Sequence, residues 1–284
     1  MNLRFSIVLA LGAALAAQTT VTVPPGAATA EQASTTAVTP VSGFAAISGS
    51  GSPGRSQYVY DSTNFTTQGI TTPIVITKMR LRANGSAQTW TGGTINQLRV
   101  DMSTAAVDYL ATTSTFDNNH SGDRSTVYNT SCTVQPGTSV VATAGSAPGG
   151  PFCCDIDLAA SGTPFAYHPA LGDLCIDFLS GGFVGSTTGV IPQWDTQTTG
   201  ALARRSFTNI GQFEATGTTP AANSLVIEFT YVPVTGLFGG FTASVRSGTS
   251  PLVVQFTDVS ASGLGPVTSW AWDFENDGIW DDFT

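Results

Sequence analysis

The chain has 284 residues, and only 10% of them are charged, against roughly 25% in an average soluble protein. Nineteen acidic residues outnumber ten basic ones, for a formal charge of −9. This balance excludes the basic surface that nucleic-acid phosphates require and argues against electrostatic docking on anionic lipid.

The first sixteen residues have the pattern of a signal peptide. Arg4 supplies a positive charge, residues 7–17 are apolar, and Ala14-Leu15-Ala16 fits the small-x-small cleavage rule, so we expect cleavage after Ala16. The apolar run is shorter than the roughly 20 residues that span a bilayer. No second run is long enough, so we expect no transmembrane segment and a secreted or cell-surface location.

Residues 17–40 are rich in Ala, Thr, Val, Pro and Gln and lack periodicity, which predicts a flexible low-complexity segment. A β domain is expected over residues 41–233. Several of its segments alternate apolar and polar residues, as in Leu225/Ile227/Phe229, which predicts a β-sandwich or jelly-roll-like domain with one buried and one wet face per strand. The expected strands are Gln57–Tyr60, Ile74–Arg82, Ile95–Met102, Ser125–Val134, Cys154–Leu158, Leu174–Leu179 and Ser224–Val232.

Most of residues 57–180 carry a family resemblance. The segments that carry it include Tyr58-Val59-Tyr60-Asp61-Ser62, the run over residues 72–82, Thr163-Pro164-Phe165-Ala166-Tyr167-His168-Pro169-Ala170, and the run over residues 172–178. They resemble a β domain of bacterial exported proteins that often carry a PEP-CTERM sorting tail. The resemblance implies secretion and a sandwich fold. The family has no enzymatic activity that could be assigned to residues of this chain.

Four cysteines follow the signal peptide: Cys132, Cys153, Cys154 and Cys175. An even number in an oxidising compartment favours two structural disulfides. A bridge between the adjacent Cys153 and Cys154 would be strained, so we expect each to pair with Cys132 or Cys175; the sequence leaves the pairing open.

Motifs for catalysis are missing from the sequence. There is no Gly-x-Ser-x-Gly elbow and no His-Glu-x-x-His zinc motif, and His120 and His168 lie in loop-like sequence. Carboxylates could act in pairs across a cleft, as in glycoside hydrolysis; the pairs are Asp155 with Asp157 and Asp173 with Asp177. An acidic β domain offers such pairs by chance, so we predict a non-enzymatic protein with no catalytic residues and no organic cofactor.

Two tryptophans suggest a sugar-binding platform. Trp90 and Trp194 lie in polar, loop-like sequence beside Gln and Asp residues. An exposed indole covers the C–H groups of a sugar while polar neighbours bond its hydroxyls. The alternative is that each ring closes one end of the core.

The chain's last segment resembles half of a PKD domain, an immunoglobulin-like extracellular module. After a hinge over residues 234–240, the runs over residues 250–258 and Ser269-Trp270-Ala271-Trp272-Asp273-Phe274 match its first strands. We expect residues 241–284 to form only the N-terminal half of such a module, so the sequence resembles a fragment of a longer chain; whether the natural chain continues past Thr284 is left open by the sequence.

The acidic turn of this segment predicts either of two structures. Oxygen ligands at alternate positions followed by glycine resemble a calcium loop, and the candidate ligands are Asp273, Glu275, Asp277 and Asp281. The same residues also suit a β-hairpin turn.

The sequence therefore predicts an all-β, exported, modular protein. The leading hypothesis is adhesion or binding of an extracellular polysaccharide or surface protein, with the PKD-like segment as a spacer. The alternatives are an accessory region of a larger secreted hydrolase and a structural surface-layer component.

Overall fold

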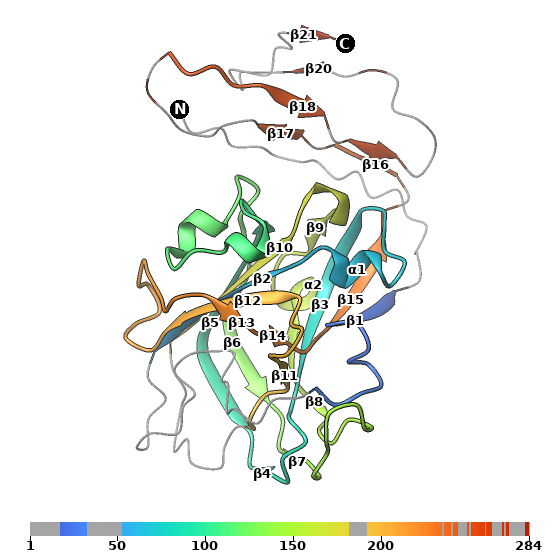
Figure 1. The fold of residues 1–284 in the computed structure, drawn as a ribbon, viewed down its shortest axis with the longest axis vertical. Helices are drawn as coiled ribbons and strands as arrows, with labels where there is room; N and C mark the ends of the chain where they lie inside the picture. The colour runs from blue at the N-terminus through green and yellow to red at the C-terminus, as the bar shows by residue number, and fades with distance from the viewer. Residues whose placement is uncertain are drawn as a thin grey trace. The chain divides into compact units, whose positions relative to one another are not determined.

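The computed structural model describes residues 18–32, 53–181 and 192–234, together with short stretches between residues 236 and 283 (Figure 1). Contacts divide the chain into two compact units, one spanning Gln18–Val232 and the other containing the residues from Pro233 onward. No helix in the described stretches is long and apolar enough to cross a membrane.

The larger unit is all-β, as predicted, and most of its strands form one curled antiparallel sheet. Along the sheet the order is β1-β15-β3-β8-β6-β5-β10-β2-β12-β13, with β9 also paired to β3. The strands are β1 (Thr19–Val23), β2 (Gly54–Tyr60), β3 (Ile74–Arg82), β5 (Gly93–Thr104), β6 (Ser125–Val134), β8 (Phe152–Asp157), β9 (Phe165–Tyr167), β10 (Leu174–Ser180), β12 (Ala203–Thr208), β13 (Ala221–Ala222) and β15 (Ile227–Pro233).

Short elements complete this unit. Two small strand pairs lie outside the main sheet: β4 (Thr89–Trp90) with β7 (Gly137–Thr138), and β11 (Thr196–Gln197) with β14 (Ser224–Leu225). The helices are single turns: α1 (Thr63–Thr66), α2 (Leu158–Ser161), and the 3-10 turns η1 (Tyr109–Ala111), η2 (Phe116–Asn119) and η3 (Pro169–Leu171).

The pairing within the sheet is shortest between β8 and β6. These two strands share a single residue pair, Val134 opposite Cys154, whereas β10 and β5 are paired over seven residues. We call strands β1, β15, β3, β8 and β9 leaf A, strands β6, β5, β10, β2, β12 and β13 leaf B, and the Val134–Cys154 junction the seam. The predicted sandwich is thus one sheet folded at the seam.

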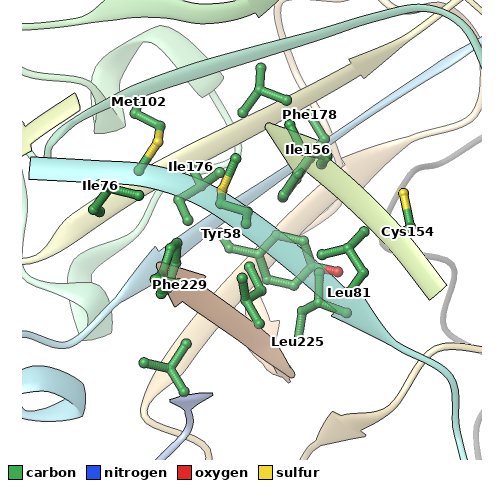
Figure 2. Close-up of a cluster of buried hydrophobic side chains, with 14 of the residues drawn as sticks. Tyr58, Ile76, Leu81, Met102, Cys154, Ile156, Ile176, Phe178, Leu225 and Phe229 are labelled. Atoms are coloured by element: carbon green, nitrogen blue, oxygen red, sulfur yellow. The ribbon is translucent and has the colours of Figure 1, made fainter. Parts of the chain in front are cut away.

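Both leaves supply the hydrophobic core. Figure 2 shows Tyr58 and Ile176 of leaf B together with Leu81 and Phe229 of leaf A in one cluster. The hydroxyl of Tyr60 also donates a 2.8 Å hydrogen bond to the carbonyl of Leu225. Alternation places these residues inside: in β15, Ile227, Phe229 and Tyr231 are buried and the residues between them are half-buried.

One prediction about the N-terminal part is wrong. Within the segment 17–40, expected to be flexible, Thr19–Val23 form β1 and pair with β15 over five residues. Val21 and Val23 are buried in the core. In the residues that follow β1, the carbonyls of Ala27 and Ala30 accept hydrogen bonds from the guanidinium of Arg82. An unstructured segment would leave these backbone groups to water.

The second unit consists of short antiparallel pairs. The pair β16 (Leu237–Phe238) with β19 (Ala261–Ser262) continues in the same register as β17 (Phe241–Ala243) with β18 (Phe256–Asp258). A third pair joins β20 (Ala271–Trp272) to β21 (Asp282–Phe283). Leu237 and Phe238 therefore belong to a strand, although residues 234–240 were predicted as a hinge.

Candidate functional site

The two tryptophans predicted to form a sugar platform are buried. Trp90 is 2% exposed and Trp194 is 0% exposed, so neither ring can stack on a glycan and this prediction is wrong. The indole of Trp90 donates a 2.6 Å hydrogen bond to the carbonyl of Gln135, and its ring lies against Gly137. Their loop-like sequence is misleading because the residues that cover them come from distant segments.

The four carboxylates considered for paired catalysis all have other partners. Asp155 binds Lys78 at 2.7 Å and Arg80 at 3.1 Å. Asp157 caps α2 by accepting from the backbone of Ala160. The carboxylate of Asp173 accepts the backbone amides of Ser62 and Tyr109, and Asp177 is fully buried. In these positions the carboxylates hold loops and strands together.

Asp177 lies at the centre of a buried polar network on the outer face of leaf B. The guanidinium of Arg55, 4% exposed, donates to both carboxylate oxygens of Asp177 at 2.5–3.1 Å. Arg55 also lies over the ring of Phe116 and donates to the carbonyl of Glu214. Gln57 connects Asp177 to the turn η2 through the carbonyl of Phe116. The network therefore fixes η2 and the 209–217 loop onto the sheet.

This network contains a serine, a histidine and an aspartate in contact. The hydroxyl of Ser103 lies 2.8 Å from Nδ1 of His120, and Nε2 of His120 lies 3.3 Å from the carboxylate of Asp177. No sequence motif marks this arrangement. The β5–β10 register brings Ser103 and Asp177 onto neighbouring strands, with Ser103 opposite Cys175 and Asp101 opposite Asp177, and His120 joins them through its bridge to Ala105.

The geometry of the three residues fits a structural role. Ser103 and Asp177 are 0% exposed, so a substrate has no route to the hydroxyl. The same carboxylate oxygen of Asp177 that faces His120 is also bound by Arg55 at 2.5 Å, so Asp177 is already ion-paired within the network. His168, the other histidine, accepts the backbone amide of Ala170 at the start of η3, and burial lowers its pKa.

A groove of about 770 Å³ opens on the same outer face, at the other end of the strands. Its floor is a row of side chains across three neighbouring strands: Asn129 of β6 lies opposite Arg99 of β5, which lies opposite Leu179 of β10. The walls include Asn96, Gln97, Thr130, Ser131, Gly181, Gln212 and Phe213.

A bulge in β5 forms one wall of the groove. The register with β6 shifts between Ile95 and Leu98, and Gln97 adopts a left-handed conformation with φ of 50°. Such a conformation is uncommon outside glycine and is often found at functional sites. The bulge leaves the side chains of Asn96 and Gln97 exposed beside the floor.

The groove is polar but carries little free charge. Arg99 donates two hydrogen bonds, at 2.8 and 2.7 Å, to the buried carboxylate of Asp101. Although burial alone would raise the pKa of Asp101, hydrogen bonds from Arg99 and Thr126 and the nearby arginine charges hold it below its usual value. The groove therefore offers amides, hydroxyls and one charge-compensated guanidinium.

Apolar contact in the groove comes from the opposite wall. The ring of Phe213 is 72% exposed, and its neighbour Gln212 has a buried side-chain oxygen without a hydrogen-bond partner among the described residues. Groups of this kind bind uncharged, hydroxyl-rich ligands well.

The predicted calcium ligands Asp273, Glu275, Asp277 and Asp281 lie outside the described residues. Among the residues that the structure does describe, no cluster of three or more His, Cys, Asp or Glu side chains could hold a metal ion.

Comparison with known proteins gives no match: no family model, no curated protein and no solved structure is similar to this chain. The resemblances to the PKD and PEP-CTERM-associated families stay predictions from the sequence.

Proposed function

We propose that this is an exported, non-enzymatic binding protein whose larger unit holds a neutral polysaccharide in the groove on leaf B. The PKD-like segment serves as a spacer in this proposal. The observation that carries it is the chemistry of the groove: amides and hydroxyls from Asn96, Gln97, Asn129, Thr130 and Ser131 lie around one exposed aromatic ring.

Sugars need this combination of groups. Amide side chains donate and accept at the same time and so match the hydroxyls of a sugar, while an aromatic ring covers its C–H face. Because Arg99 is bonded to Asp101, a carboxylated or sulfated glycan would have to compete with a buried carboxylate. A neutral chain faces no such competition.

Affinity electrophoresis of the full chain tests the proposal. The protein runs in native gels that contain a neutral glucan, xylan or galactomannan, or the anionic alginate for comparison. We expect at least one neutral polysaccharide to retard the protein. Phe213→Ala should weaken that retardation by about 2- to 12-fold in Kd, because a lost aromatic contact costs about 0.5–1.5 kcal/mol.

Two variants make the test specific to the groove. Asn129→Ala removes an exposed amide from the floor and should also weaken binding. Leu110→Ala removes an apolar side chain that is 60% exposed in η1, away from the groove, and should leave binding unchanged. Retardation that survives both groove variants would mean that the ligand binds elsewhere, and retardation by alginate alone would contradict a neutral ligand.

A further inference from the structure

The four cysteines occupy unequal positions. The sulfurs of Cys132 in β6 and Cys154 in β8 are 3.2 Å apart, and both side chains are buried in the core at the seam. Cys153 belongs to the same buried cluster, whereas Cys175, which is also fully buried, lies beside the polar network with its sulfur 3.9 Å from Nε2 of His120. All four are thiols in the structure.

Cys175 cannot reach the other cysteines. Along β5, Cys175 of β10 is level with Ser103, while Cys132 of β6 is level with Ile95. Ser103 and Ile95 are eight residues apart on β5, which corresponds to about 26 Å along the strand. In the sheet order β8-β6-β5-β10, three strand spacings of about 4.8 Å each also separate Cys175 from Cys153 and Cys154. A disulfide needs Cα atoms within about 7 Å.

Cys153 and Cys154 compete for Cys132, and the strand geometry favours Cys154. Successive side chains of a strand point to opposite faces. Cys154 shares its face with Ile156 and lies opposite Leu81, on the side where its sulfur meets that of Cys132. Cys153 lies at the register shift between the Leu81–Cys154 and Arg82–Phe152 pairs, and it is the sulfur of Cys154 that lies 3.2 Å from that of Cys132.

We infer that Cys132 and Cys154 form a single disulfide across the seam, while Cys153 and Cys175 stay thiols. The inference uses the predicted export, because an oxidising compartment supplies the oxidant. A disulfide-carrying oxidoreductase or a small-molecule disulfide accepts the two electrons and two protons. Both S–H bonds break, one Sγ–Sγ bond forms, and the oxidant's disulfide is reduced to two thiols.

Burial explains how the remaining thiols persist beside a disulfide. Exchange requires a thiolate, and burial raises the pKa of Cys153 to about 12 and that of Cys175 well above its usual value. At neutral pH both groups are protonated and do not attack the bridge.

The position of the bridge gives it a mechanical role. In the described part of the chain, β6 and β8 are paired at the seam through Val134 and Cys154 alone, so a covalent bond there replaces the hydrogen bonds that a longer pairing of these two strands would provide. It also anchors the loop over residues 135–151, which holds Trp90 through Gln135 and Gly137.

Differential alkylation of the secreted full chain tests the pairing. The protein is unfolded in guanidinium with excess iodoacetamide, then reduced and labelled with N-ethylmaleimide. Trypsin leaves all four cysteines in one peptide, residues 125–204, so fragmentation in the mass spectrometer must locate each label. We expect acetamide on Cys153 and Cys175 and maleimide on Cys132 and Cys154.

Two serine variants form a matched pair. Cys153→Ser should leave one free thiol in the unfolded, unreduced chain, and Cys154→Ser should leave three. A bridge from Cys132 to Cys153 would give the opposite counts. Two disulfides, or four free thiols in the secreted wild type, would also overturn the inference.

A stability measurement reports on the seam itself. Wild-type protein kept in reductant from purification onward should have a Tm lower by on the order of 10 °C than the oxidised protein, because the bridge closes a loop of about 22 residues. If labelling shows that the disulfide is present, yet the oxidised and reduced proteins have equal Tm values, the disulfide does not stabilise the seam.

Discussion

Replacing Arg55 with methionine should destabilise the larger unit strongly. The change preserves much of the side-chain volume but removes a guanidinium that bonds both oxygens of Asp177 at 2.5–3.1 Å. Asp177 is fully buried, and breaking a buried ion pair by removing one partner costs about 3–5 kcal/mol. Gln57 and His120 still reach Asp177 at 3.3 Å, and the guanidinium of Arg124 lies 3.8 Å from it. We therefore expect a loss of stability near the lower value, about 3 kcal/mol.

Urea unfolding of the full chain, followed by far-ultraviolet circular dichroism, measures this loss. Arg204→Met is the control, because Arg204 lies on the neighbouring strand β12 and makes one long bond, 3.4 Å, to the carbonyl of Pro220; it should cost less than about 1 kcal/mol. A double-mutant cycle with Asp177→Asn should give a coupling energy of about 2 kcal/mol or more. Equal losses for the two arginine variants would refute the reasoning.

The same variant connects stability to the groove. Arg55 donates a 2.9 Å hydrogen bond to the carbonyl of Glu214, next to Phe213, and so fixes the loop that carries the exposed ring. If the proposed function is correct, Arg55→Met should weaken polysaccharide binding although Arg55 does not line the groove.

Three further predictions concern pH, packing and salt. The pKa of Asp101 is lowered in the folded state. Its contribution to stability is therefore present above its unfolded pKa, near 3.8, and is lost as the pH falls below that value. Asp101→Asn should lower the Tm at pH 7 and make the Tm less sensitive to acid between pH 5 and 2. Gly137→Ala would place a Cβ 2.6 Å from the Trp90 ring and should lower the free energy of unfolding by about 1–3 kcal/mol. The control is Gly122→Ala, whose Cβ would have nothing within 4 Å; it should be nearly neutral in the same urea titration. The Kd for polysaccharide should change less than about twofold between 50 and 500 mM NaCl. The charge of Arg99 is already compensated by Asp101, so few ions are released on binding. A steep loss of affinity with salt would indicate an anionic ligand.

Much of leaf A and leaf B could be predicted because alternation is a local signal. The expected strand Ile74–Arg82 coincides with β3, and the expected Ser125–Val134 coincides with β6. The strand β1 was missed because five Thr and Val residues carry no more signal than the low-complexity sequence around them. Its structure depends on the open edge of β15, more than 200 positions away.

The candidate site could not be predicted for the same reason. Asn129, Arg99 and Leu179 form one floor only because β6, β5 and β10 are neighbours in a particular register. A shift of one residue in either pairing would turn these side chains into the core. Trp90, conversely, looked exposed because its own sequence is polar, while the residues that bury it lie 45 positions further along the chain.

The scarcity of charge has a structural explanation that bears on the ligand. The chain has ten Lys and Arg residues. Among the residues that the structure describes, six of them form ion pairs with carboxylates: Arg55, Lys78, Arg80, Arg82, Arg99 and Arg124. The basic side chains of this unit therefore serve mainly to connect strands and loops. Under the proposed function, we expect a groove lined by amides and hydroxyls to recognise its ligand by hydrogen-bond geometry, so a neutral polysaccharide should bind more tightly than an anionic one.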